Sequence, residues 1–127
     1  MLDHITFGVA DLERAIAFYD KALAPLAITR LFEVTAEETG GAAFAGYGDT
    51  RPFFWIGNGE ASKGALHVAF TAPDRATVDA FYQAAMAAGG RDNGPPGIRA
   101  HYHPDYYGAF VLDPEGRNIE AVCHAPE

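Results

Sequence analysis

The feature that most constrains the fold of this chain is an internal repeat at an offset of 63 residues. Identical residues recur at this offset through a strand-like stretch and the helix-like stretch behind it. The matched pairs are His4 with His67, Phe7 with Phe70, Asp11 with Asp74, Phe18 with Phe81, Tyr19 with Tyr82 and Ala22 with Ala85. The repeat predicts two copies of one unit, a first module over residues 1–60 and a second over residues 64–124, in a single domain of 127 residues.

Each copy opens with a stretch in which successive side chains alternate in character. In a strand, Phe7 lies on one face and His4 on the other, and the same holds for Phe70 and His67. Both opening strands therefore have an apolar face suited to packing under a helix and a face of small and polar residues. The two histidines occupy equivalent places on that second face.

A helix is expected behind each opening strand. Asp11 and Asp74 are suited to the N-cap position, and apolar residues follow each of them at helical spacing. The first helix should end shortly before Pro25, and the second at Gly89-Gly90. The Phe-Tyr pair inside each helix is expected in the core.

Shorter strands should complete each module. They are expected near residues 28–35, 42–48 and 52–57 in the first half and near 98–102, 107–112 and 117–123 in the second, with a turn-rich loop over 89–97. The aromatic run 53–55 is expected in the core or in the wall of a cup. The predicted fold class is α+β, two βαβββ modules whose sheets join edge to edge and curl into a cup lined by His4 and His67.

The last two strands are predicted to form a hairpin. Asp113-Pro114-Glu115-Gly116 separates two apolar runs, because Pro presets φ and Gly permits positive φ. Arg117, just after this turn, is expected to be solvated. Glu120 stands between apolar neighbours in the second strand, and an unpaired carboxylate there would cost several kcal/mol if buried. Glu120 therefore needs either a solvent-exposed position or a charged or hydrogen-bonding partner.

His4, His67 and Glu120 together predict a divalent-metal site. Two imidazoles and one carboxylate suit such an ion and leave positions open for water or substrate. The repeat places Gly57 or Ile56 opposite Glu120 in the first module, and neither can bind a metal through its side chain. Three protein ligands are therefore expected. An open site of this kind favours catalysis over a structural role.

A second group of candidate residues lies between 99 and 107. His101 and His103 would share a strand face if this segment is extended, and either is a candidate general base beside a bound substrate. Tyr106 is a third candidate for moving a proton. The alternatives are an exposed loop without chemistry, and a competing metal site made by the His-x-His pair.

Composition excludes several functions. The formal net charge is −8 and no basic cluster is present, which argues against nucleic-acid binding. No apolar run approaches the length of a membrane span, and the N-terminus lacks a basic leader pattern, so a cytoplasmic protein is expected. Cys123 is the single cysteine, which rules out an intrachain disulfide. A small-molecule substrate remains the expected partner.

The segments DHITFGVADLERAIAFYDKAL, LHVAF and YGAFVLDPEGRNIEAV resemble the vicinal oxygen chelate superfamily, which includes glyoxalase I, extradiol dioxygenases and the fosfomycin and bleomycin resistance proteins. The resemblance implies paired βαβββ modules, a homodimer, and an Fe, Mn, Zn or Ni ion that chelates substrate through vicinal oxygens. It favours a glyoxalase-like enzyme with lyase, isomerase or dioxygenase chemistry. Its alternatives are a thiol transferase like the fosfomycin resistance proteins, and a protein that sequesters a cationic ligand like the bleomycin resistance proteins.

Overall fold

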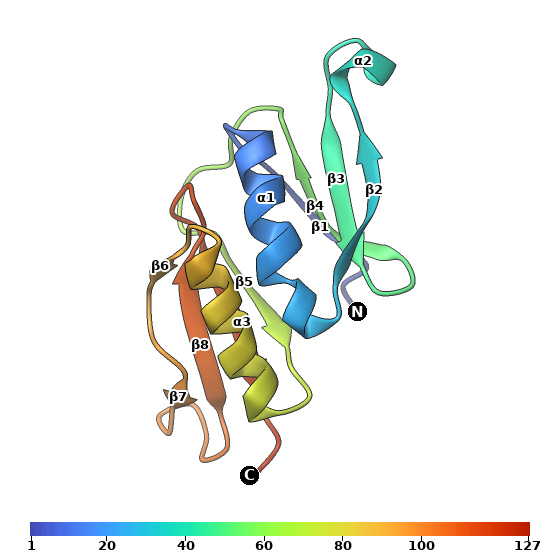
Figure 1. Cartoon of the computed structure of the whole chain (residues 1–127). Helices are drawn as coiled ribbons and strands as arrows, with labels where there is room; N and C mark the ends of the chain where they lie inside the picture. Colours follow the sequence, from blue (N-terminus) through green and yellow to red (C-terminus); the bar gives the residue numbers. More distant parts are fainter.

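The computed structural model describes all 127 residues and contains two successive units of strand, helix and further strands (Figure 1). The first unit comprises β1 (Ile5–Gly8), α1 (Leu12–Ala22), the 3₁₀ turn η1 (Ala24–Leu26), β2 (Thr29–Val34), α2 (Ala36–Thr39), β3 (Phe44–Gly48) and β4 (Pro52–Gly57). The second comprises β5 (His67–Thr71), α3 (Arg75–Ala87), β6 (Arg91–Asp92), β7 (Gly97–Ile98), β8 (Tyr107–Leu112) and β9 (Asn118–Cys123). The predicted α+β class is confirmed. No helix is long and apolar enough to cross a membrane.

Each unit has its own sheet. The first sheet has the strand order β1-β4-β3-β2, and the second has the order β5-β9-β8-β6, with β7 also paired to β8. β1 runs parallel to β4 and β5 runs parallel to β9, while the other pairs are antiparallel. The opening strand of each unit therefore lies at the edge of its sheet, next to the unit's last strand.

The two helices begin where the sequence predicts. Asp11 accepts a hydrogen bond from the backbone N–H of Arg14 at 3.1 Å, and Asp74 accepts one from that of Thr77 at 2.8 Å. Each aspartate satisfies a donor that the first helical turn leaves unpaired. Both predicted N-caps are thereby confirmed.

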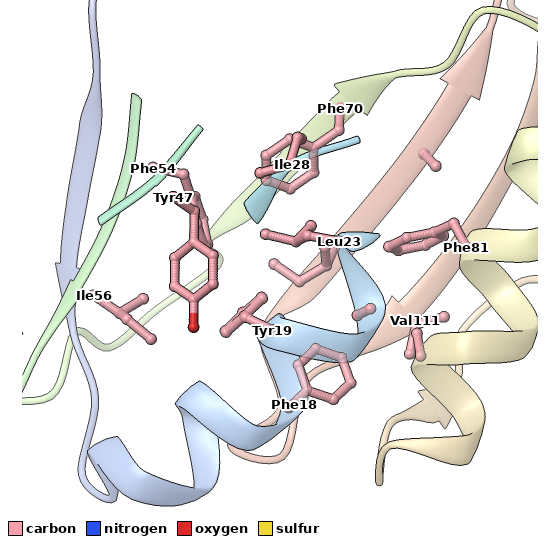
Figure 2. Packing of buried hydrophobic residues seen from close by; sticks show 14 of the residues in the cluster. Phe18, Tyr19, Leu23, Ile28, Tyr47, Phe54, Ile56, Phe70, Phe81 and Val111 are labelled. Atoms are coloured by element: carbon pink, nitrogen blue, oxygen red, sulfur yellow. The ribbon is translucent and has the colours of Figure 1, made fainter. Parts of the chain in front are cut away.

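The core lies between the two sheets, with α1 and α3 packed against each other inside it (Figures 1 and 2). Phe18, Tyr19 and Phe81 are fully buried there, as the sequence predicts. Tyr82 is only partly buried, because its hydroxyl reaches outward to Asp92 at 3.1 Å, so the prediction of a core position is wrong for this residue. Phe54 of β4 and Phe70 of β5 meet edge to face, with ring centroids 5.3 Å apart. Aromatic packing thus joins the two units. The opposite face of each sheet, which carries His4 or His67, has no helix against it.

The turn between β8 and β9 fastens the second unit to the first. The Glu115 carboxylate accepts the backbone N–H groups of Ala10 at 2.8 Å and Asp11 at 2.9 Å. Arg117 donates to the Gly8 carbonyl at 2.8 Å and to Glu115 at 3.2 Å. Its side chain is 7% exposed, so the prediction of a solvated Arg117 is wrong. The reason is that Arg117 also binds the Gly8 carbonyl and lies over the Phe7 ring, both in the first unit and more than a hundred positions away along the chain.

Asp113 is the buried centre of this turn. Its Oδ2 atom accepts the Tyr19 hydroxyl at 2.6 Å and lies 3.5 Å from the Arg117 guanidinium, and its Oδ1 atom accepts the backbone N–H of Arg117 at 2.9 Å. Burial, followed by the Asp113 charge, raises the pKa of Tyr19 well above its ordinary value. The tyrosine therefore remains a proton donor to Asp113.

The second module differs from expectation around the segment predicted as a strand over 98–102. Only Gly97–Ile98 is a strand there, and the chain then turns twice: Tyr102 N–H donates to the Arg99 carbonyl at 2.9 Å and Tyr106 N–H to the His103 carbonyl at 3.2 Å. These backbone hydrogen bonds within the segment take the place of hydrogen bonds to a neighbouring strand. His101 and His103 consequently do not share a strand face.

The sheets also do not join edge to edge within the chain. β1 and β5 have no strand beyond them, and an apolar cavity of ≈ 270 Å³, lined in part by Ile5, Phe54, Val68 and Phe70, lies between them. The aromatic packing of the core holds the sheets at this separation. β1 and β5 are thus free edges of the two sheets, opposite the outer edges formed by β2 and β6, and each of these two strands borders a histidine.

Replacing Tyr19 with Phe should lower the free energy of unfolding by about 1–3 kcal/mol, because buried Asp113 loses a hydrogen bond that no water can replace. Urea unfolding followed by circular dichroism measures the change. Tyr47→Phe is the matched control, since its hydroxyl binds Asp20 at the edge of the core, at 2.8 Å. A loss for Tyr19→Phe no larger than that for Tyr47→Phe would contradict the role given to Asp113.

Candidate metal and substrate site

Glu120 is the centre of the candidate site. It lies on β9, between Ala69 of β5 and Phe110 of β8 in register, and it is 1% exposed. Its Oε1 atom is 3.0 Å from His67 Nε2, and its Oε2 atom accepts a hydrogen bond from the Tyr106 hydroxyl. Three of the residues singled out in the sequence therefore meet on the helix-free face of the second sheet.

Gly108 makes the room for this cluster. A Cβ atom at this position would lie 3.1 Å from Glu120 Oε2 and 3.2 Å from the Tyr106 ring. Any side chain there would push the hydroxyl and the carboxylate apart. Sequence reasoning missed Gly108, although a glycine inside a strand is the pattern that marks a close approach of this kind.

Tyr106 keeps its proton under ordinary conditions. Burial, followed by the hydrogen bond to Glu120, raises the pKa of Tyr106. Its hydroxyl is thus a donor directed at Oε2, which leaves Oε1 to face His67. The tyrosine fixes the orientation of the carboxylate.

Glu120 has no permanently charged partner. Its one ion-pair partner within 4.0 Å is His67, and no lysine or arginine reaches it. A buried carboxylate is stable when it is paired or when it coordinates a cation. One carboxylate oxygen facing one imidazole nitrogen is a donor set that suits a divalent metal ion, so these residues fit the predicted group.

His4 lies on the corresponding face of the first sheet. Its Nδ1 atom is 2.7 Å from Asp3 Oδ1, and the other oxygen of Asp3 is 2.5 Å from Arg51 Nη2. The hydrogen bond from His4, followed by the Arg51 charge, lowers the pKa of Asp3. A carboxylate on Nδ1 leaves Nε2 available, as is usual for a metal-binding histidine.

His4 does not join His67 and Glu120 within one chain. No three His, Cys, Asp or Glu side chains lie close enough to hold a metal ion. His4 instead borders a hollow of ≈ 510 Å³ on the first sheet, whose wall includes Thr6 and Trp55. The candidate site is therefore divided between the two free faces of the molecule.

Phe44 and Trp55 form an aromatic wall of this hollow, and Phe32 packs against Trp55 outside its lining. The Trp55 ring lies 6.1 Å from the Phe32 ring and 6.1 Å from the Phe44 ring, centroid to centroid. Gly46 on β3 pairs with Trp55 and leaves the space for the indole, because a Cβ there would approach it to 2.6 Å. The sequence placed Trp55 in the core or the cup wall, and it lies in the wall.

The histidines of the turn segment lie apart from Glu120. His101 is exposed, and its ring lies against that of Tyr102 at 4.2 Å. His103 Nδ1 accepts the backbone N–H of Asp105 at 3.0 Å, so the proton of the neutral ring is on Nε2, 2.7 Å from His124 Nδ1. Neither imidazole makes a polar contact with the His67–Glu120 pair.

Comparison with known families identifies the family of the chain. A family model described as the Glyoxalase/Bleomycin resistance protein/Dioxygenase superfamily matches residues 1–121. The chain belongs to this superfamily. No curated protein gives a significant match.

Solved structures of the glyoxalase/bleomycin resistance/dioxygenase fold are similar over nearly the whole chain. A glyoxalase/bleomycin resistance protein from Albidiferax ferrireducens is 31% identical, with a TM-score of 0.77, over 94% of this chain and 96% of that one. A family enzyme from Burkholderia phytofirmans is 20% identical, with a TM-score of 0.71, over 98% of both chains. A maize glyoxalase I mutant is 22% identical, with a TM-score of 0.72, over 95% of this chain and 46% of that one. The last two likenesses concern the fold alone.

Gly108→Ala should destabilise this superfamily member by about 1–3 kcal/mol, since the added methyl overpacks the space between Tyr106 and Glu120. Thermal and urea unfolding measure the loss. Gly59→Ala is the matched control, because nothing lies within 4 Å of a Cβ there. Equal effects of the two substitutions would contradict the tight packing around Glu120.

Proposed function

We propose that the protein is a metal-dependent, glyoxalase-like enzyme that acts on a small oxygenated substrate. The observation that carries this proposal is the buried Glu120 carboxylate, which faces His67 Nε2 at 3.0 Å and has no lysine or arginine partner. Such a carboxylate costs stability unless a cation completes its surroundings. Its place on a sheet face without a helix leaves room for substrate.

His67, Glu120 and His4 are the residues that would hold the ion, which is Fe, Mn, Zn or Ni. When bound, it would act as a Lewis acid on a substrate oxygen. Tyr106 would hold the carboxylate in place and keep a proton beside the substrate, because its raised pKa disfavours ionisation. Tyr106 contacts the His67–Glu120 pair, whereas His101 and His103 do not, so the geometry supports Tyr106 as the hydrogen-bond donor of the site.

The complete set of ligands would form between two chains of a homodimer. His4 borders the free edge of β1 and His67 lies on the free edge of β5, and unpaired strand edges favour pairing with another chain. A two-fold contact repeats each pairing, so a dimer that joined β1 of one copy to β5 of the other would contain two equivalent sites. Each site would combine His4 of one copy with His67 and Glu120 of the other.

Lyase or isomerase chemistry is the leading reaction class, with dioxygenase or thiol-transferase chemistry as the other catalytic options. The aromatic wall of Phe44 and Trp55 favours one further function, a binding protein that sequesters a planar cationic ligand without turnover. The enzyme requires the imidazole of His4. The sequestering protein would keep its ligand affinity in His4→Ala.

Metal content separates these functions. Purified protein should hold about one divalent ion per chain, and His67→Ala and His4→Ala should each lower metal affinity by about tenfold or more. Inductively coupled plasma mass spectrometry and competition with a chelator measure both quantities. His101→Ala, an exposed histidine on the same chain, should keep the ion. Protein that neither carries nor takes up metal would contradict the enzyme and favour the sequestering protein.

A heterodimer experiment tests where the site forms. Co-expressing a His4→Ala chain with a His67→Ala chain under two affinity tags should yield heterodimers with about half the wild-type metal content, because one of the two sites keeps all its ligands. Each variant homodimer should have no intact site. Heterodimers with no more metal than the homodimers would show that the ligands do not come from two chains.

A further inference from the structure

Arg99 is a half-buried arginine without a counter-ion. The arginines that form ion pairs with Asp or Glu are Arg30, Arg51, Arg75 and Arg117. Arg99 has no carboxylate oxygen within 4.0 Å, although the chain has 17 acidic residues against 9 basic ones. A guanidinium removed from water in an acidic protein would ordinarily have found such a partner.

The Arg99 guanidinium is held in place by backbone. Its Nη1 donates to the Gly97 carbonyl at 2.9 Å, and its Nη2 donates to the Pro95 carbonyl at 2.7 Å. A Cβ at Gly94 or Gly97 would lie 3.1 or 3.3 Å from its nitrogens, so glycines allow the loop to close around it. Since a guanidinium has five N–H donors, about three remain after these two bonds.

This guanidinium lies beside the candidate site. Its Cζ atom is 5.4 Å from the centre of the Phe110 ring, and the His67 ring is 6.0 Å from the same ring. Phe110 pairs directly with Glu120 across β8 and β9, so both side chains stand on the same face of the sheet. One aromatic ring therefore neighbours both the His67–Glu120 pair and a fixed positive charge.

We propose that Arg99 binds the carboxylate of a small organic acid, which is the substrate of the site proposed above. The carboxylate forms charge-assisted hydrogen bonds with the free donors of Arg99. The apolar part of the molecule lies over Phe110, and its vicinal oxygens face His67 and Glu120. This inference rests on the proposed function for the position of the oxygens, whereas the recognition of the carboxylate needs only Arg99. It disfavours a cationic ligand on this face.

A matched pair of probes tests the inference: protocatechuate, a benzoate with two vicinal hydroxyls, and its uncharged methyl ester. In isothermal titration of the metal-loaded protein, the acid should bind about tenfold or more tightly than the ester. Arg99→Gln should abolish this preference, and Arg99→Lys should weaken it, because lysine keeps the charge and loses the planar fork. Arg91→Gln is the control, since Arg91 is exposed on β6 and also lacks a carboxylate partner.

Equal affinities for acid and ester in the wild type, failure of both to bind, or a preference that survives Arg99→Gln would each overturn the assignment. Circular dichroism of each variant verifies that it is folded. If Arg99→Gln does not fold, Arg99→Lys is compared with the wild type instead. Metal content is measured on the same samples. Protein that binds no metal but prefers the acid would contradict the proposed function and support Arg99. Protein that binds metal but shows no preference for the acid would support the proposed function and contradict the role of Arg99.

Discussion

The structure depends on the turn that joins β8 and β9. Asp113, Glu115 and Arg117 belong to the second module, yet they bind the Tyr19 hydroxyl, two backbone N–H groups at the start of α1 and the Gly8 carbonyl of the first. Arg117 also lies over the Phe7 ring, at 5.0 Å from its centre. These buried, charge-assisted contacts fix the relative position of two similar units that could otherwise pack in several ways. The same turn leads directly into β9, so the strand that carries Glu120 is anchored at its beginning.

Beyond this turn, the helix-free face of the second sheet holds a polar cluster. Gly108 removes one side chain and Tyr106 takes the vacated space, which brings a hydroxyl to a carboxylate inside the protein. The first sheet uses the same device for a different purpose, because Gly46 leaves room for Trp55 and produces an apolar wall. Two copies of one repeat have thus diverged into a charged face and an aromatic face. Trp55 pairs with Thr6 as Glu120 pairs with Ala69, its equivalent 63 residues further on, so Trp55 holds the place of Glu120 in the first module. The expectation of Gly57 or Ile56 at this place is therefore wrong, although the residue there still lacks a carboxylate.

Local patterns in the sequence predict most of the fold. The N-caps at Asp11 and Asp74 depend on neighbours within a few positions, and the repeat supports the prediction twice. The helical spacing also predicts the buried Phe18, Tyr19 and Phe81, and only Tyr82 lies partly outside the core. The need of Glu120 for a partner also follows from its own strand. The burial of Arg117 could not be predicted, because the first-unit groups that cover it, the Gly8 carbonyl and the Phe7 ring, are remote in sequence. The turns over residues 99–106 could not be predicted either. The alternation of side chains there resembles that of a strand, but the backbone forms hydrogen bonds within the segment instead of with a neighbouring strand.

The free edges of β1 and β5 have a consequence for how the protein responds to its surroundings. If a metal ion is held by residues of two chains, the ion and the second chain are coupled ligands of the first, and each must strengthen the binding of the other by the same factor. Occupancy then varies with protein concentration as well as with metal supply, by mass action. A cell that makes little of this protein would keep it largely as metal-poor monomers. A rise in protein concentration would then increase both the fraction of dimer and the fraction of sites that hold metal.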